Sequence, residues 1–211
     1  MDSRRVVAYL AVHRRPQSRV GLAADLWPGV APEAAARLLA EAVSGIDVPG
    51  LLAGDAADTS APLALADEVE VDLSDAMLLV RAFSGGGRLT ERPAVDLLSE
   101  DILPSWTSPW IAVERERFRQ LRLASLEEVS LKLSASGLHT DAVEIAEIAV
   151  AAAPSRESAR RALIEALLAK GDVVEAVAQY DAFQELLRTS VGPQSGGLEG
   201  LFPPAGSWPI R

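Results

Sequence analysis

The sequence contains no cysteine, and this absence removes several kinds of site at once. Without thiols, a chain can form neither disulfide bonds nor thiolate nucleophiles, and it lacks the usual ligands of structural zinc. The two histidines, His13 and His139, lie far apart, so we predict no metal site and no cofactor. We also predict no enzyme: no motif marks an activated serine, and "SGGGRL" (84–89) lacks the Gly-Lys-Ser/Thr of a phosphate-binding loop.

Long apolar runs are missing as well. No window reaches the roughly 18 uncharged apolar residues that a membrane-spanning helix requires. The early stretch "VVAYLAV" (6–12) is short and lacks a small-residue cleavage site, so we expect no signal peptide, no membrane partner and a cytoplasmic protein. Aromatic residues make up only 5% of the chain, and this scarcity, together with abundant alanine and leucine, favours a mainly helical fold.

Positive charge is scarce over a long stretch of the chain. The formal net charge is -10, and residues 21–80 contain one cation, Arg37, against eleven carboxylates. Nucleic-acid-binding domains usually present a basic surface, because phosphate neutralisation supplies much of their affinity. Binding to DNA would therefore depend on a local group of arginines.

Three short helices are predicted at the start of the chain. Apolar residues recur with helical spacing in residues 3–13, and a second helix follows within 18–29, where Ser18 is a suitable cap. A third helix begins at Pro32 and ends near Gly45, since proline favours the first turn of a helix and glycine favours its end.

The stretch 47–73 has a different pattern. Turn residues separate short apolar runs, and "EVEVDL" (68–73) alternates with period two, which predicts a β-hairpin with a long acidic tip and a last strand at Val69–Leu73. Three helices followed by a hairpin are the outline of a winged helix-turn-helix, which we assign to residues 3–73.

Helical patterns return from Ser74, which we expect to cap a helix that ends at the glycines 85–87. A loop containing Trp106 and Trp110 precedes a long amphipathic helix. The expected buried side of that helix comprises Phe118, Leu121, Leu126, Val129 and Leu133.

An internal repeat follows. Gly137 and Gly171 are 34 residues apart, which is the period of the tetratricopeptide repeat, and Pro154 closes the first repeat. Small or aromatic residues recur at equal distances after the two glycines: Ala142 and Ala176, Ala146 and Tyr180, Ala149 and Phe183. We therefore predict an all-α, tetratricopeptide-like domain over 74–191 and a mostly flexible tail over 192–211, in which Leu198, Leu201 and Phe202 could dock as one turn.

The segments "LWPGVAPEAAARLL", "EVEVDL" and "DILPSWTSPWIAVERERFRQLRLASLEE", followed by the two repeats, together resemble the SARP family of actinobacterial transcriptional activators. The resemblance spans roughly residues 4–202 and is most specific in "VERERFRQLRL". It implies an OmpR-like winged helix joined to a bacterial transcriptional activation domain. It further implies binding to promoter repeats and recruitment of RNA polymerase through the sigma factor and the alpha subunit.

The chain departs from that family in two places. The family usually has a small sheet before the first helix, whereas only Met1 and Asp2 precede that helix here, so we expect the sheet to be missing, trimmed or encoded upstream. The third helix of the family typically carries several Arg, Asn and Thr residues, but this chain has "RLLAEAVSGI" (37–46) at the matching positions. Base-edge readout needs such donors and acceptors, so little sequence specificity is expected.

Two sets of arginines are candidate contacts. The candidates for DNA are Arg4, Arg5, Arg14, Arg15, Arg19 and Arg37. The candidates for a protein partner are Arg115, Arg117, Arg119 and Arg122. Glutamates are interleaved with the second set, so a solvated, salt-bridged helix face is the alternative. Likewise, Trp106 and Trp110 either stack on bases or serve as buried anchors of the helical domain.

Two hypotheses about function follow. In the first, the chain is a SARP-type transcriptional regulator that binds promoter DNA through a winged helix and contacts RNA polymerase through the helical domain. In the second, it is a degenerate interaction protein that does not bind DNA and acts on another regulator through the helical repeats. A homodimer is compatible with either.

Overall fold

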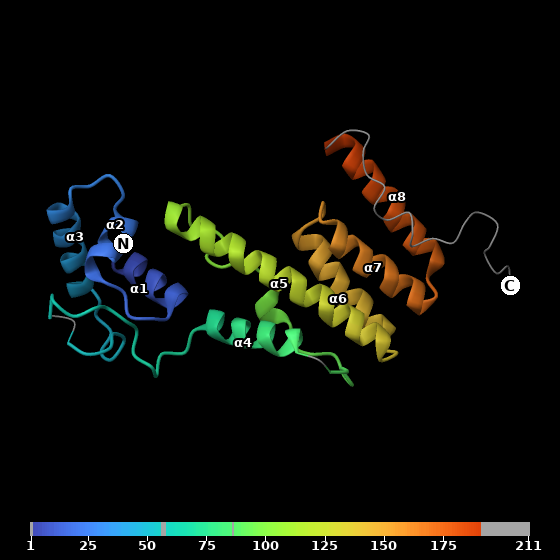
Figure 1. Ribbon diagram of the computed structural model, residues 1–211, viewed down its shortest axis with the longest axis horizontal. Helices are drawn as coiled ribbons and strands as arrows, with labels where there is room; N and C mark the ends of the chain where they lie inside the picture. The colour runs from blue at the N-terminus through green and yellow to red at the C-terminus, as the bar shows by residue number, and fades with distance from the viewer. Residues whose placement is uncertain (1, 56–57, 86, 191–211) are drawn as a thin grey trace. The chain divides into compact units, whose positions relative to one another are not determined.

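Helices account for most of the chain in the computed structural model, which describes residues 2–55, 58–85 and 87–190. The helices of these residues are α1 (Asp2–His13), α2 (Arg19–Leu26), α3 (Pro32–Ser44), α4 (Asp72–Ser84), the 3-10 turn η1 (Asp96–Leu98), α5 (Pro109–Ala135), α6 (His139–Ala152), α7 (Glu157–Lys170) and α8 (Val173–Ser190) (Figure 1). The prediction of a mainly helical fold is confirmed. The tail 192–211, with its expected docking turn, lies outside the described residues.

The chain divides into two units, each with its own core. The first unit comprises the residues up to Ala76 together with Ile102–Arg117, and the second comprises Met77–Asp101 together with the residues from Phe118 onward. Both α4 and α5 contribute residues to each unit.

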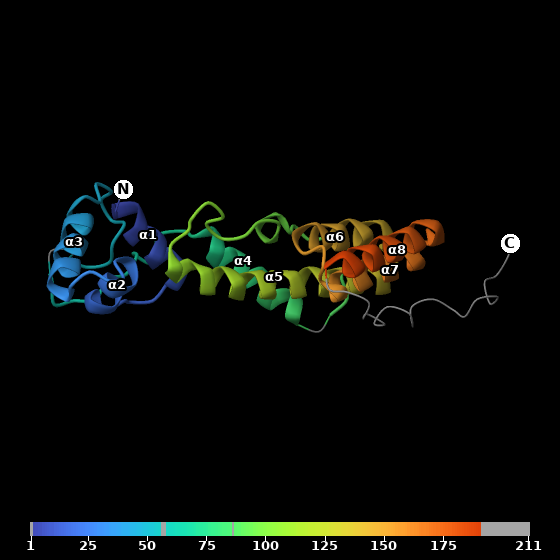
Figure 2. The same cartoon turned by 90° about the horizontal axis from the view of Figure 1, so that it is seen from above.

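In the first unit, α1, α2 and α3 pack against one another (Figures 1 and 2). The predicted helix signals are confirmed: the Ser18 hydroxyl accepts a bond of 3.1 Å from the N–H of Gly21, Pro32 opens α3, and Gly45 follows its last residue. The largest fully buried side chains of this core are Leu10, Leu22, Leu26, Leu39 and Leu63, and Val6, Tyr9 and Trp27 belong to the same cluster.

The predicted β-hairpin is not present as such. Among the described residues of 45–75, pairing is limited to isolated antiparallel bridges that join Gln17 to Leu63 and Leu52 to Leu65. The predicted strand Val69–Leu73 is wrong, because α4 already begins at Asp72. Nevertheless, Val69 and Val71 are half-buried against the core of the first unit, as their alternation with acidic residues implied.

The replacement of the predicted strand by the start of α4 has a physical reason. Period-two alternation specifies which side chains face a core, but a strand also needs a neighbouring segment to complete its ladder of hydrogen bonds. Here the carbonyl of Val71 accepts from the N–H of Ser74 at 2.8 Å and therefore starts a helix. Asp72 and Asp75 in the first turn favour that start, because carboxylates interact well with a helix amino terminus. Ser74, the expected cap, thus lies inside the first turn.

In the second unit, α7 packs against both α6 and α8 (Figures 1 and 2). Gly137 and Gly171 lie between the helices of successive pairs with φ of 83° and 92°, so their predicted role as turns is confirmed. The N–H after each glycine bonds to a carbonyl five residues earlier, which closes the preceding helix. These bonds join Leu138 to Leu133 at 2.9 Å and Asp172 to Leu167 at 2.9 Å.

The small residues of the repeat lie at the helix contacts. Five of the six residues that recur after the glycines are at most 1% exposed, and Tyr180 is half-buried. The five are Ala142, Ala146, Ala149, Ala176 and Phe183. Alanine side chains are small enough for two helices to approach closely, which explains why α6 and α7 contain so many buried alanines.

Candidate functional site

Two of the six arginines expected to contact DNA are engaged within the first unit. Arg5 donates to the carbonyl of Leu26 at the end of α2. Arg19 donates to the carbonyl of Asp58 at 2.8 Å and to that of Ala61 at 3.0 Å. The Arg5 bond joins α1 to the end of α2, and the Arg19 bonds fasten the acidic stretch after α3 to α2, so both side chains have a structural role.

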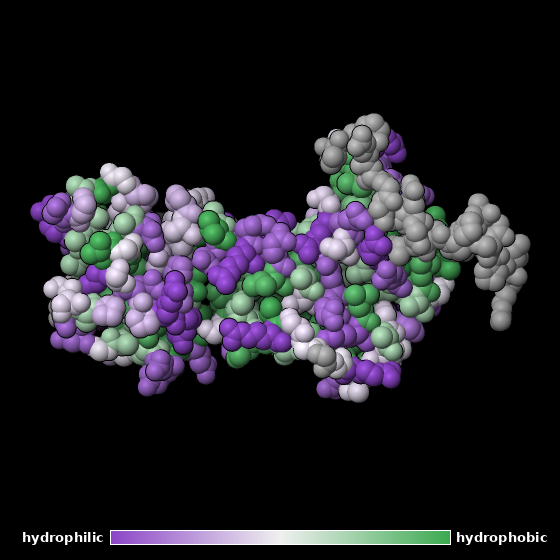
Figure 3. Space-filling view, viewed as in Figure 1, coloured by the Kyte–Doolittle hydropathy of each residue, from purple (hydrophilic) through white to green (hydrophobic). Residues whose placement is uncertain are grey.

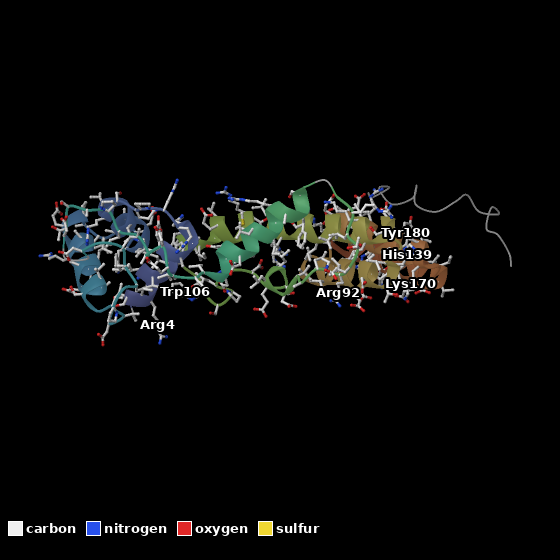
Figure 4. The ribbon with its side chains drawn as sticks, turned by 90° about the horizontal axis from the view of Figure 1, so that it is seen from below. Arg4, Arg92, Trp106, His139, Lys170 and Tyr180 are labelled. Carbon is white, nitrogen blue, oxygen red and sulfur yellow. The ribbon has the colours of Figure 1, made fainter. Side chains whose placement is uncertain are left out.

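The other four, Arg4, Arg14, Arg15 and Arg37, are exposed. Within the described residues, no hydrogen bond or ion pair engages their side chains. Arg4 extends away from α1 in Figure 4. Arg14 follows the last residue of α1 in a left-handed conformation, with φ of 48°, and its N–H bonds to the carbonyl of Leu10 at 2.9 Å. The carboxyl end of α1 is therefore followed by two adjacent exposed cations.

The exposed side of α3 has little chemistry for reading DNA. Arg37 is exposed there between Glu33 and Glu41, which lie one helical turn before it and one after it. Ala36 and Ala40, exposed on the same side, offer no hydrogen-bond donor or acceptor. The net charge of this face is thus negative.

The segment that follows α3 is strongly acidic. Residues 45–75 contain no lysine or arginine, and each of their carboxylate residues is exposed. These are Asp47, Asp55, Asp58, Asp67, Glu68, Glu70, Asp72 and Asp75. Hydrogen bonds from Ser60 hold the pKa of Asp58 below its ordinary value, which keeps that carboxylate charged. Such a surface repels a polyanion.

An aromatic cluster joins α1 to the start of α5 within the first unit. The ring of Tyr9 lies 4.2 Å from that of His13 and 5.0 Å from that of Trp110, and Trp106 lies 6.5 Å from Trp110. Trp110 also packs against the core of the first unit. Its burial supports the interpretation as an anchor, although of the first unit and not of the helical repeats.

Two ionisable groups of this cluster are perturbed. The hydroxyl of Tyr9 donates to Asp25 at 2.5 Å, and burial together with that carboxylate raises the pKa of Tyr9 well above its usual value. Burial lowers the pKa of His13, although the charge of Glu114 acts in the opposite direction. Both groups are therefore held in their neutral forms.

Arg115 on α5 holds the loop that precedes this helix, residues 102–108, which we call the tryptophan loop. Its guanidinium donates to the carbonyls of Ile102 at 3.1 Å, Leu103, and Trp106 at 2.8 Å. Two residues further on, Arg117 is exposed, and within the described residues no hydrogen bond or ion pair engages its side chain.

In the second unit, Arg119 and Arg122 make similar bonds. Arg119 donates to the carbonyl of Ala152 at 3.0 Å. Arg122, only 2% exposed, donates to the carbonyl of Leu98 at 3.1 Å and to the carboxylate of Asp101. Positions 115, 119 and 122 follow helical spacing, and this signal in the sequence could have indicated that these arginines share a face. Arg117 is the exposed member of the set.

Two further cations of the second unit were not predicted as functional. Lys132 donates to the carbonyls of Phe83 at 2.6 Å and Gly85, at the end of α4. Arg160 is 8% exposed, and its guanidinium lies 5.7 Å from the centre of the Phe183 ring. Burial lowers the pKa of Arg160. All of these contacts lie within the helical domain and stabilise it.

The described part of the chain holds no group of three or more metal-ligating side chains. Nor does it contain a helix that is both long and apolar enough to cross a membrane. Hydrophilic and hydrophobic residues are interspersed on the face shown in Figure 3.

Comparison with known proteins gives one family. A sequence profile described as the bacterial transcriptional activator domain matches residues 86–197, just over half of the chain. The match includes α5 to α8 in full. No curated protein matches the sequence.

Proposed function

We propose, because the chain belongs to the family of bacterial transcriptional activator domains, that its first unit binds promoter DNA while its second unit contacts RNA polymerase. The family is regulatory and not enzymatic, which supports a role in transcription activation. A regulator that makes both contacts, one with promoter DNA and one with RNA polymerase, is of the SARP type.

The observation that carries the DNA contact is the exposure of four arginines in the first unit. Arg4, Arg14, Arg15 and Arg37 are exposed, with no hydrogen bond or ion pair to their side chains among the described residues. Arginine side chains in this condition can bind phosphate oxygens without first breaking an internal bond.

The contact with polymerase is supported by the second unit. Its helix α8 carries Val174 at 86% exposure and Val177 at 37%. Exposed apolar side chains are common where a helical surface meets a partner. Another regulator or a second copy of the chain could use the same surface.

A salt series tests the DNA contact. The full chain would be incubated with duplexes selected from a randomised library, and the fluorescence anisotropy of labelled duplex would be followed as salt rises. We expect the affinity to fall steeply, because each phosphate contact releases counterions. An affinity that does not change with salt would contradict the proposed contact. Transcription in vitro from a promoter carrying a selected sequence tests the polymerase contact, with Val174→Ser expected to reduce activation.

The acidic face of α3 favours a second candidate function. A first unit that no longer binds DNA would leave the chain as an interaction protein acting through its helical domain. In the same salt series such a protein would bind no duplex at any salt concentration. Its binding to another regulator would still depend on α8, so Val174→Ser would weaken that binding.

A further inference from the structure

We infer that the first unit contacts DNA through the two ends of α1, with Arg4 at one end and Arg14 and Arg15 at the other, and that it holds phosphates without reading the base sequence. This inference rests on the proposed DNA binding and narrows it. A winged helix-turn-helix would instead read bases through its third helix.

The spacing of these arginines suits a duplex. Arg4 and Arg14 are ten positions apart, which corresponds to about 15 Å along a helix at 1.5 Å per residue. The major groove of B-DNA is about 12 Å wide, so long arginine side chains at the two ends can reach phosphates on either side of one groove.

The ends of α1 also keep their charge. Asp2, the carboxylate nearest to Arg4 in sequence, forms its ion pair with Arg5 at 3.6 Å. Asp25, which accepts the Tyr9 hydroxyl, and Glu114 are the carboxylates near the other end, and within the described residues neither forms an ion pair with Arg14 or Arg15. The left-handed backbone at Arg14 ends the helix and exposes two cations in succession.

By contrast, α3 cannot read bases as a recognition helix does. Its exposed side offers Arg37 between two glutamates, and the alanines at 36 and 40 lack polar atoms. The hydroxyl of Ser44 already donates to the carbonyl of Ala40 at 2.9 Å. A single guanidinium that neighbouring carboxylates partly neutralise supplies little of the donor and acceptor pattern that distinguishes base pairs.

Charge repulsion also opposes a contact between α3 and DNA. The eight exposed carboxylates of residues 45–75 follow α3 in the chain, and that stretch has no cation to balance them. If α3 approached the groove, it would bring this negative segment toward the phosphates, which is unfavourable. The ends of α1 are the described part of the first unit where exposed cations outnumber exposed carboxylates.

The test measures how the loss of one arginine charge, or of three together, changes binding to two DNA duplexes. The two duplexes have the same base composition in a different order. Binding of the full chain is measured by anisotropy over a salt series for the variants Arg4→Gln, Arg14→Gln and Arg15→Gln, for the three combined, and for Arg37→Gln. We expect the triple variant to lower the slope of log affinity against log salt by about three, one for each lost phosphate contact. We expect Arg37→Gln to change the affinity by less than about twofold, since a residue without a phosphate contact leaves the slope unchanged. Both duplexes should respond alike.

Arg117→Gln is the matched control, because it removes the same charge from an exposed position on α5 and not from α1. All substituted positions are exposed, so thermal unfolding should be unchanged and a folding defect can be recognised. A dominant effect of Arg37→Gln, or a clear preference for one duplex, would overturn the inference and leave the proposed DNA binding intact. Failure of the unsubstituted chain to bind either duplex at low salt would instead remove the proposed DNA binding, and the inference with it.

Discussion

Arg122 and Asp101 form a nearly buried ion pair in the second unit. The Nε and Nη2 atoms of Arg122 donate to Oδ1 of Asp101 at 3.0 and 2.9 Å, and the Arg122 side chain is 3% exposed. Its Nη1 atom donates to the carbonyls of Leu98 and Ser99. One guanidinium therefore positions the stretch 98–101, most of which has no regular secondary structure.

Removal of this guanidinium should destabilise the second unit strongly. Arg122→Met leaves the Asp101 carboxylate and two carbonyls without their donor, and breaking a buried pair in this way costs about 3–5 kcal/mol. Urea unfolding followed by circular dichroism measures the loss. Arg117→Met, on the same helix but exposed, should change the free energy of unfolding by less than about 0.5 kcal/mol. Equal effects of the two substitutions would show that Arg122 contributes no special stability.

The left-handed turn at Gly171 predicts that two substitutions there destabilise the fold by different amounts. Its φ of 92° is unfavourable for residues with a Cβ, while an added Cβ would meet no atom within 4 Å. Gly171→Ala should therefore cost about 1–2 kcal/mol through the backbone alone. Gly171→Asn should cost less, because asparagine tolerates the left-handed region better than alanine does. Thermal unfolding of the two variants checks the order, and a larger loss with asparagine would contradict this account.

Close helix packing predicts a difference between two alanines of α6. Ala149 is fully buried and Ala151 is exposed. Ala149→Leu should destabilise the fold by about 1–3 kcal/mol, because added methyl groups force the neighbouring helix away. Ala151→Leu should be nearly neutral. If both variants unfold at the same urea concentration as the unsubstituted chain, the interface is looser than the burial indicates.

The cluster around His13 predicts a stability change with pH. Burial lowers the pKa of His13 below its ordinary 6.5, so the unfolded chain binds more protons than the folded chain as pH falls through that value. The neutral histidine thus contributes stability that is complete above about pH 6.5 and is lost at lower pH. Glu114, Asp25 and Arg15 are the charged groups around it.

His13→Gln should remove this component. Unfolding free energies of the variant and the unsubstituted chain would be compared at several pH values, so that the titration of carboxylates common to both cancels. As pH falls, the excess unfolding free energy of the unsubstituted chain over the His13→Gln variant should shrink or reverse. A difference that stays constant with pH would show that protonation of His13 is not coupled to folding.

The helical elements could be predicted from local sequence signals. Ser18, Pro32, Gly45 and Gly171 each act through the backbone of their own turn, so a short window of sequence contains the cause of the structure. The conformation of residues Val69–Leu73 could not be predicted in this way. Alternation correctly indicated which valines face the core, but whether a second segment pairs with them depends on distant parts of the chain.

The candidate site was predictable only in part. The scarcity of cations on α3 could be read directly from the sequence. The sequence does not indicate which arginines are bound internally, because Arg5 and Arg19 donate to main-chain carbonyls 21 and 39 positions away. A carbonyl acceptor leaves no mark in the sequence, whereas a carboxylate partner would.

The same property has a consequence for how the tryptophan loop can vary. Every amino acid has a carbonyl oxygen, so the acceptors of Arg115 at positions 102, 103 and 106 persist whatever side chains occupy those positions. These bonds therefore constrain the length of the loop more than its composition: a single deletion would move the oxygens away from the guanidinium.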